Sequence, residues 1–420
     1  MPLSSLLIQI VVVLAATRLV GWLLRKIHQP QVVGEMLAGI LLGPSLLGWL
    51  LPDVSAVIFP RGSLDALYAL SQIGLLLFMF LVGVEFDPAI LRGRGHAAVV
   101  TSHVSIIVPF CLGAVLATFL YPALSPQNVP MLHFVLFSGL AMSITAFPVL
   151  ARILTEQRLL NTQVGAIAIA CAAVDDVTAW CLLAGVALVV HAEQTTTPFL
   201  VTLLGSLAYI GVMLLGVRRV LAPLGELYER RSAMSYDLLA IVLLLALASA
   251  WVTESLGIHA LFGAFLMGVV MPKRLGFVHA LAGKLEAVTV TLLLPLFFAY
   301  TGLRTSIGLL NGADMWLYCA LIILVAIAGK MGGSALAAHR FGMAWREAGA
   351  LGILVNTRGL IELVFLNIGL DMGIITPTFF TMMVLMALVT TFMTTPLLRW
   401  VYPLRVQRPI FSGAETPERI

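Results

Sequence analysis

The sequence predicts an all-α polytopic membrane protein, and three observations carry this prediction. Of the 420 residues, 60% are hydrophobic and only 10% are charged, whereas a soluble domain carries about 25% charged residues. The mean hydropathy is +1.05. Apolar stretches near the length that a helix needs to cross a bilayer, about 20 residues, follow one another along almost the whole chain.

The apolar stretches divide into thirteen candidate transmembrane helices joined by short polar connections. They cover residues 4–24, 31–51, 66–86, 97–120, 131–153, 162–190, 199–221, 235–253, 258–272, 285–303, 315–338, 347–370 and 376–401. Residues 1–401 are therefore predicted to form one membrane domain, and residues 402–420 a short cytoplasmic tail without a regulatory domain.

Lysine and arginine positions predict the orientation, because cytoplasmic connections of membrane proteins are rich in both. With the N-terminus outside, the outside connections hold only Arg61 and Arg304. Arg18, Lys330 and Arg358 lie within spans, and every other lysine and arginine falls inside. The sequence therefore predicts an N-terminus outside and a C-terminus inside. This explains the net charge of +4 without a nucleic-acid partner.

Two adjacent carboxylates, Asp175 and Asp176, lie in the middle of the apolar run 164–190. A charged side chain at that depth costs at least about 2.5–3.5 kcal/mol. A helix cap does not explain the pair, because helical sequence continues for more than a turn on either side. A structural ion pair is the alternative, but two carboxylates in succession favour a polar cavity with a function.

Two spans are interrupted by polar or helix-breaking residues. In the fifth span Pro148 lacks a backbone donor and disfavours helix before it, while Ser143 and Thr145 can bond the freed backbone groups. In the twelfth span the sequence 356–362 is polar and contains a glycine. Broken helices are tolerated in membranes where they are buried or face water. A kinked packing helix is the alternative for each.

The two interrupted spans are seven spans apart, so they run in opposite directions. This topology predicts inverted repeats at about 1–190 and 235–401, with the span 199–221 as a connector. Paired broken helices in matching positions of inverted halves indicate a transporter's binding site. No residue-level repeat is visible, so the symmetry follows from topology alone.

Three further charges lie within spans. Lys330 is near mid-depth among small residues and needs a partner, for which Asp175 and Asp176 are the candidates. Adjacent helical residues point about 100° apart, so one aspartate can face Lys330 while the other faces a cavity. Snorkelling of Lys330 to the interface is the alternative. Arg358 and Glu362 share one helix face, where a local pair or charge balance at the crossing accounts for both.

Several long motifs follow one another in order along the chain: GEMLAGILLGP at 34–44, QIGLLLFMFLVGVEFD at 72–87, SITAFPVLARIL at 143–154, VDDVTAW at 174–180, ALFGAF at 260–265, LPLFF at 294–298 and NTRGLIE at 356–362. Together they resemble the monovalent cation:proton antiporter-2 family, with the membrane domains of Kef-type and plant CHX exchangers as similar members.

The resemblance implies a fold like that of the NapA and NhaA antiporters. That fold is a homodimer in which a core domain of crossed broken helices moves against a dimerisation domain. It also implies that Asp176 carries the ion and the proton and that Asp175 pairs with Lys330. Ser143 and Thr145 would lie around the ion.

The predicted function is exchange of a monovalent cation, Na⁺ or K⁺, for protons across a bilayer, with the cation held at Asp176 and no cofactor. A carboxylate in a poorly hydrated cavity holds either a proton or a cation, which couples opposite fluxes. The expected location is a bacterial inner membrane. A cation channel and an organic-solute transporter on the same fold are the alternatives. No nucleophile–base or metal pattern indicates an enzyme.

Overall fold

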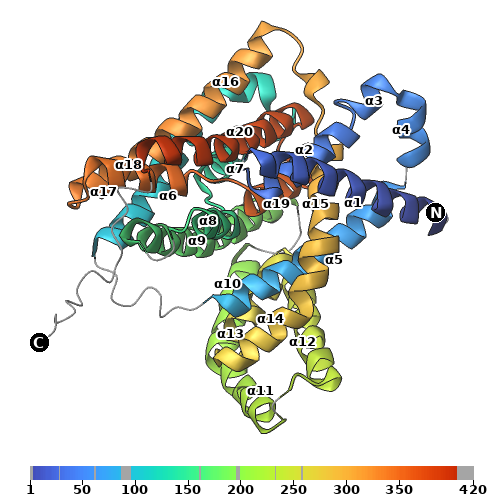
Figure 1. Ribbon diagram of the computed structural model, residues 1–420, viewed down its shortest axis with the longest axis vertical. Coiled ribbons are helices and arrows are strands. Elements are labelled where there is room, and N and C mark those ends of the chain that lie inside the picture. The colour runs from blue at the N-terminus through green and yellow to red at the C-terminus, as the bar shows by residue number, and fades with distance from the viewer. Residues whose placement is uncertain are drawn as a thin grey trace, which may run out of the picture. The chain divides into compact units, whose positions relative to one another are not determined.

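The computed structural model describes residues 3–27, 29–60, 63–86, 96–159, 162–194, 199–231, 233–256 and 259–403. Within these ranges the chain is helical and forms no β-strand (Figure 1). The predicted all-α class is therefore confirmed. Arg61 and nearly all of the predicted tail, residues 404–420, lie outside the described residues.

The chain divides into two compact units, each assembled from separated segments. Unit 1 comprises Met1–Thr17, Leu41–Ala89 and Trp180–Leu303, and unit 2 comprises Arg18–Ile40, Ile90–Ala179 and Arg304–Ile420. Three helices contribute residues to both: α1 (Leu3–Lys26), α2 (Gln31–Leu42) and α9 (Gln163–Gln194). The predicted inverted repeats are a different division of the chain and stay a prediction.

Unit 1 contains the apolar motifs 72–87 and 260–265, which lie largely on two helices that pack against each other. Its further helices are α3 (Leu47–Leu50), α4 (Pro52–Ile58), α5 (Leu64–Glu85), α10 (Phe199–Gly211), η2 (Val212–Val217), α11 (Arg218–Arg231), α12 (Tyr236–Ser255), α13 (Ala260–Val270), α14 (Leu275–Val288), η3 (Thr289–Leu293) and α15 (Leu294–Leu303). Helix α5 packs against α13 and α15, and α12 packs against α13.

Glycine permits the close contact between α5 and α13. A Cβ atom on Gly83 would lie 2.2 Å from the carbonyl oxygen of Phe265, and one on Gly268 would lie 2.2 Å from that of Phe80. No side chain fits at these distances, so the two backbones touch where both residues are glycine. The motifs at 72–87 and 260–265 thus bring two helices of unit 1 together.

Unit 2 contains both interrupted spans and all the buried charges singled out in the sequence. Its further helices are α6 (His96–Leu124), α7 (Met131–Ser143), α8 (Phe147–Glu156), η4 (Ile307–Leu309), α16 (Ala313–Ile327), η5 (Ala328–Gly332), α17 (Gly333–Arg340), α18 (Trp345–Val355), α19 (Leu360–Asp371) and α20 (Pro377–Val401). Within the unit α6 packs against α7, η5 and α17, and α18 packs against α17 and α20.

Both predicted breaks are confirmed. Helix α7 ends at Ser143 and α8 begins at Phe147, with Pro148 in the first turn of α8, where its missing N–H is not needed. Between them Ile144 and Ala146 adopt extended backbone conformations. Helices α18 and α19 are separated by residues 356–359 and bend by 42°.

Each of the thirteen predicted segments overlaps one helix or a run of two or three successive helices. Nine helical stretches in the described part are long and apolar enough to cross a membrane, or ten if α18 and α19 form one span. Helices α7 and α13 are apolar but have only 13 and 11 residues. The number thirteen therefore stays a prediction.

Large apolar side chains also cover much of the outer surface. Phe119 and Val220 are each 75% exposed, and Trp251 is 71% exposed. Water disfavours contiguous surfaces of this kind, whereas lipid tails accommodate them. The exposed apolar side chains are what a polytopic membrane protein requires.

Candidate functional site

The C-terminal end of α7 is held by side chains, not by a continuing helix. The last four carbonyl groups of a helix have no partner within it. The Ser143 hydroxyl donates to the carbonyl of Leu140 (2.8 Å). The guanidinium of Arg358 donates through Nη1 to Ala141 (3.0 Å) and through Nη2 to Met142 (2.6 Å).

The fourth carbonyl, that of Ser143, accepts a hydrogen bond from the ammonium group of Lys330. Two buried cations thus lie at the end of α7 that carries the negative part of the helix dipole. The carbonyl groups left free by the break are therefore satisfied by charged donors. This explains why Lys330 and Arg358 can be buried at this depth.

The two broken helices touch at their extended segments. The backbone N–H of Ala146 donates to the carbonyl of Thr357 (3.0 Å). The Thr145 hydroxyl lies 3.0 Å from the carbonyl oxygen of Val355. The crossing of α7–α8 with α18–α19 is therefore a direct contact, made by the hydrogen bond between Ala146 and Thr357.

Helix α20 completes the second break. The hydroxyl of Thr391 accepts the backbone N–H of Arg358 (3.0 Å) and donates to the carbonyl of the same residue (2.7 Å). One side chain therefore satisfies both backbone groups of Arg358. The sequence analysis did not single out Thr391, and a lone threonine in an apolar span gives little signal.

Asp175 is surrounded by donors. Its Oδ1 lies 3.0 Å from the Ser102 hydroxyl and 3.1 Å from that of Ser105, and Ser105 also lies 2.8 Å from Oδ2. Its Oδ2 accepts a hydrogen bond from the Thr145 hydroxyl (2.6 Å) and forms an ion pair with the Lys330 ammonium group (2.9 Å). An ionised carboxylate has about four acceptor positions, and four groups here supply the donors.

Lys330 lies in the short π-helix η5, which joins α16 to α17. Its side chain is fully buried, as is that of Asp175 in the same ion pair. Single π-helical turns within α-helices are frequent at functional sites. The π turn and the glycines on both sides of Lys330 set its helix apart from the regular helices of unit 2.

Asp176, the next residue on α9, has the opposite environment. It is 4% exposed, and neither carboxylate oxygen accepts a hydrogen bond of normal geometry from the described residues. The backbone N–H of Phe147, the first residue of α8, is the nearby amide donor. The N-terminal end of a helix carries partial positive charge. The amide and the helix end compensate only part of the charge of Asp176, and both of its oxygens retain free acceptor positions among the described residues.

Arg358 and Glu362 form an ion pair with 3.7 Å between Nη1 and Oε2, and both side chains are fully buried. The guanidinium is bonded mainly to the end of α7, and neither oxygen of Glu362 accepts a hydrogen bond from the described residues. The pair is therefore held by charge across a distance longer than a hydrogen bond.

Comparison with known proteins adds to this geometry. A sequence model of the family described as "Sodium/hydrogen exchanger, transmembrane" matches residues 12–401. The chain belongs to this exchanger family. The expectation of a transporter fold is thereby confirmed, because the members of this family are transporters and not enzymes.

Two relatives and one solved structure extend the match. The Na⁺/H⁺ antiporter NhaS4 of Synechocystis is 45% identical over 96% of this chain and 98% of its own length. Cation/H⁺ antiporter 19 of Arabidopsis thaliana is 40% identical over 99% of this chain, which spans about half (51%) of that relative. The structure of the sodium proton antiporter MjNhaP1 of Methanocaldococcus jannaschii matches with a TM-score of 0.66 at 14% identity, over 96% of this chain and 98% of the solved chain.

The plant relative confirms the resemblance to CHX exchangers. The solved structure, at its low identity, shows that this exchanger has the antiporter fold. Neither comparison tests the individual roles of the predicted site residues. The structure itself brings together Asp175, Lys330, Ser143 and Thr145 in unit 2, and it places Arg358 at the same end of α7.

Two side chains that contact Asp175, those of Ser102 and Ser105, were missed by the sequence analysis. They lie three positions apart on α6 and therefore share one face of the helix. Hydroxyl residues at this spacing in an apolar span are a detectable pattern. Serine is nevertheless common in membrane helices, so the pattern alone does not indicate a carboxylate partner.

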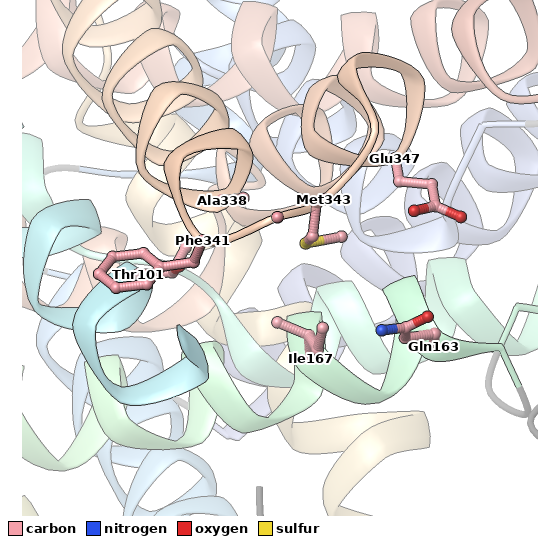
Figure 2. Close-up of a pocket in the computed structure, with 8 residues that line it drawn as sticks. Thr101, Gln163, Ile167, Ala338, Phe341, Met343 and Glu347 are labelled. Carbon is pink, nitrogen blue, oxygen red and sulfur yellow. The ribbon is translucent and has the colours of Figure 1, made fainter. Parts of the chain in front are cut away.

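A pocket of about 260 Å³ lies elsewhere in unit 2, between α6, α9, α17 and the start of α18 (Figure 2). Among the described residues that line it, Glu347 is the charged one, and it comes from a different helix than Gln163 (Figure 2). The lining consists of Thr101, Gln163, Ile167, Ala338, Phe341, Gly342, Met343 and Glu347. The charged residues at the helix crossing are not among them.

Proposed function

We propose that this exchanger transports a monovalent cation in one direction and protons in the other. One observation supports the proposal above all. Asp176 is a buried carboxylate whose two oxygens have no hydrogen-bond donor of normal geometry in the described part of unit 2, beside a neighbour, Asp175, that is fully occupied. A carboxylate in this condition binds a proton or a cation in order to compensate its buried charge.

Asp176 is the group that exchanges its occupant. Protonation gives the carboxyl group a hydrogen and removes its charge, whereas a cation supplies positive charge in place of that hydrogen. The two occupants compete for the same oxygens. If the loaded unit crosses the membrane only when Asp176 is compensated, cation movement one way requires proton movement the other way.

The neighbouring residues have supporting roles in this proposal. Asp175 holds Lys330, while the Ser143 carbonyl and the Thr145 hydroxyl supply oxygen atoms around the ion. Selectivity among monovalent cations depends on the number and field strength of such oxygens. NhaS4 is named a Na⁺/H⁺ antiporter and the plant relative a cation/H⁺ antiporter, and both Na⁺ and K⁺ are candidate substrates here.

Arg358 and Glu362 balance charge at the crossing. The guanidinium compensates the carbonyl groups of Ala141 and Met142, and the carboxylate compensates the guanidinium. This arrangement leaves the crossing close to neutral when Asp176 is occupied. Removal of either partner is expected to leave a buried uncompensated charge, which costs about 3–5 kcal/mol.

The larger assembly is also part of the proposal. We infer inverted repeats at about 1–190 and 235–401, a connector at 199–221 and an elevator movement of the unit that holds the crossing. The protein is expected to form a homodimer in a bacterial inner membrane, with its N-terminus outside and its C-terminus inside. The family resemblance and the lysine and arginine distribution support these features.

The decisive experiment is exchange in proteoliposomes. Purified protein is reconstituted with an imposed pH difference, and Na⁺, K⁺, Li⁺ or Rb⁺ is then added outside. Cation-dependent dissipation of the pH difference is expected with at least one of the four. The absence of dissipation with all four, from protein shown to be folded and inserted, would contradict cation:proton exchange.

A further inference from the structure

We propose that the hydroxyl cluster, defined as Ser102, Ser105 and Thr145, positions Asp175 and sets how easily a cation displaces Lys330. The proposal rests on cation:proton exchange at Asp176 and on a cation bound there competing with Lys330 for the adjacent carboxylate of Asp175. It adds two residues of α6, Ser102 and Ser105, to the groups that determine cation affinity. Both side chains are buried, and both lie within hydrogen-bond distance of the Asp175 carboxylate.

Three hydroxyl groups are placed to donate hydrogen bonds to Asp175. Each hydroxyl group carries one hydrogen and can give one hydrogen bond at a time. Ser102 and Thr145 also lie near backbone carbonyls, those of Cys171 (3.4 Å) and Val355 (3.0 Å). Their shorter contacts, 3.0 Å and 2.6 Å, are with Asp175. The cluster therefore directs up to three neutral donors to one carboxylate.

These donors stabilise the charge of Asp175 when Lys330 separates from it. A buried ion pair that loses one partner normally leaves an uncompensated charge, at a cost of about 3–5 kcal/mol. Asp175 would keep its three hydroxyl donors in that event. Because hydrogen bonds to charged groups are stronger than those between neutral groups, the cluster lowers the free-energy cost of separating Lys330 from Asp175.

The positions of the hydroxyl groups also fix the orientation of the Asp175 carboxylate. The three hydroxyl groups come from two different elements, with Ser102 and Ser105 on α6 and Thr145 in the break between α7 and α8. They approach both oxygens of the carboxylate, and Ser105 lies within 3.1 Å of Oδ1 and 2.8 Å of Oδ2. Asp175 is thereby fixed in rotation even without Lys330. A cation that displaces Lys330 meets a carboxylate already in place.

The cluster therefore predicts a specific kinetic effect. Without one serine hydroxyl, Asp175 depends more on Lys330, and the ion pair is harder to separate. Ser102→Ala and Ser105→Ala are each expected to raise the KM for the transported cation about tenfold, with kcat within about twofold of wild type. A purely structural role would lower the amount of folded protein without this division between KM and kcat.

Matched variants separate the hydroxyl from the volume of the side chain. Ser102→Thr and Ser105→Thr keep the hydroxyl and are expected to retain the wild-type KM. Thr118 is the control on the same helix, because it is outside the cluster and its hydroxyl donates to the carbonyl of Val115 (2.7 Å). Thr118→Ala is expected to have wild-type KM and kcat.

A second measurement does not depend on transport. Cation titrations that follow the melting temperature of the detergent-purified protein report binding directly. The alanine variants should need about tenfold more cation for the same increase in melting temperature. In the Lys330→Gln background, Ser105→Ala should lower the melting temperature by more than the sum of the two single effects, because both donors act on one carboxylate.

The outcomes distinguish the two proposals. A wild type that neither exchanges nor is stabilised by any of the four cations contradicts cation:proton exchange and this inference with it. An active wild type whose folded Ser102→Ala and Ser105→Ala variants keep the wild-type KM and cation titration overturns the inference alone. If one alanine variant does not fold, the other decides the question, since each leaves two of the three hydroxyls.

Discussion

Lys273 in unit 1 and Lys330 in unit 2 both place an ammonium group on carbonyl oxygens near the end of a helix. Lys273 donates to Gly83 (2.6 Å) and Val84 (2.8 Å) at the end of α5, and to Gly268 (3.1 Å) near the end of α13. Lys330 donates to one carbonyl, that of Ser143 at the end of α7, and to the carboxylate of Asp175.

The two lysines differ in the acceptor groups that lie beside these carbonyl oxygens. The three hydrogen bonds described for Lys273 go to neutral backbone groups at a contact of two glycines, so the ammonium joins two helix ends, and its charge also acts on the Glu85 carboxylate at the end of α5. Around Lys330 the acceptor set includes a carboxylate, and a second carboxylate follows it on α9. A cation can compete with Lys330 for a carboxylate, whereas it gains little by competing with Lys273 for helix carbonyls.

The largest expected effect comes from removing the second carboxylate. Asp176→Asn keeps the shape and polarity of the side chain but can neither exchange a proton nor attract a cation by charge. Exchange in proteoliposomes should fall to the level of empty liposomes, while the melting temperature and membrane insertion stay those of wild type. Near-normal exchange by this variant would remove Asp176 from the site.

The next effect concerns the electrical character of exchange. If a cation displaces Lys330 from Asp175, the freed ammonium group can release its proton. A second proton then accompanies the one lost by Asp176, and transport moves net charge. With Na⁺ as substrate and K⁺ on both sides, valinomycin clamps the potential and should accelerate exchange driven by the pH difference.

Lys330→Gln should abolish either that acceleration or the exchange itself. Lys273→Gln is the matched control, because it also removes an ammonium group from helix carbonyls, and it should keep the sensitivity to valinomycin. A wild-type rate that is indifferent to the clamp over a range of imposed potentials indicates one proton per cation. Lys330 would then have a structural role like that of Lys273.

The helix breaks and the contact of Lys330 are the features of this site that the sequence predicts. The breaks were predictable because Pro148 and the polar sequence at 356–359 act locally on the backbone. A contact of Lys330 with Asp175 or Asp176 was predictable because a charge at mid-depth needs a partner and few are available, whereas the choice of Asp175 came from the family resemblance. These inferences use only a residue and its depth in a span.

What could not be predicted depends on how helices face one another. Ser102 and Ser105 gain their role only because α6 presents them to Asp175, and Lys273 only because α5 and α13 end together. The number of spans does not follow from the sequence for a related reason. Short helices such as α13, with 11 residues, do not reveal by length alone whether they cross a bilayer.

A smaller effect is expected from Lys273→Met, which tests the structural half of the comparison. The variant leaves the carbonyl groups of Gly83, Val84 and Gly268 without this donor, although Lys273 is partly exposed and water can replace some of the bonds. A loss of about 1 kcal/mol corresponds to a fall of about 1 °C in melting temperature for a chain of this length. The KM for the cation should not change, and a tenfold increase would show that unit 1 contributes to cation binding.

The smallest expected effect is that of Ser143→Ala, which tests which atom of Ser143 matters. The hydroxyl of Ser143 donates within its own helix to Leu140 (2.8 Å), whereas its backbone carbonyl accepts from Lys330. Alanine removes the first contact and keeps the second, so the KM for the cation should change by less than about threefold, which is below 1 kcal/mol. Thr145→Val removes a hydroxyl that donates to Asp175 (2.6 Å) and should raise the KM several times more. Equal increases in the two variants would mean that the Ser143 hydroxyl itself binds the ion. The cation would then reach the end of α7, in contrast to the end of α5, where Lys273 is expected to exclude it.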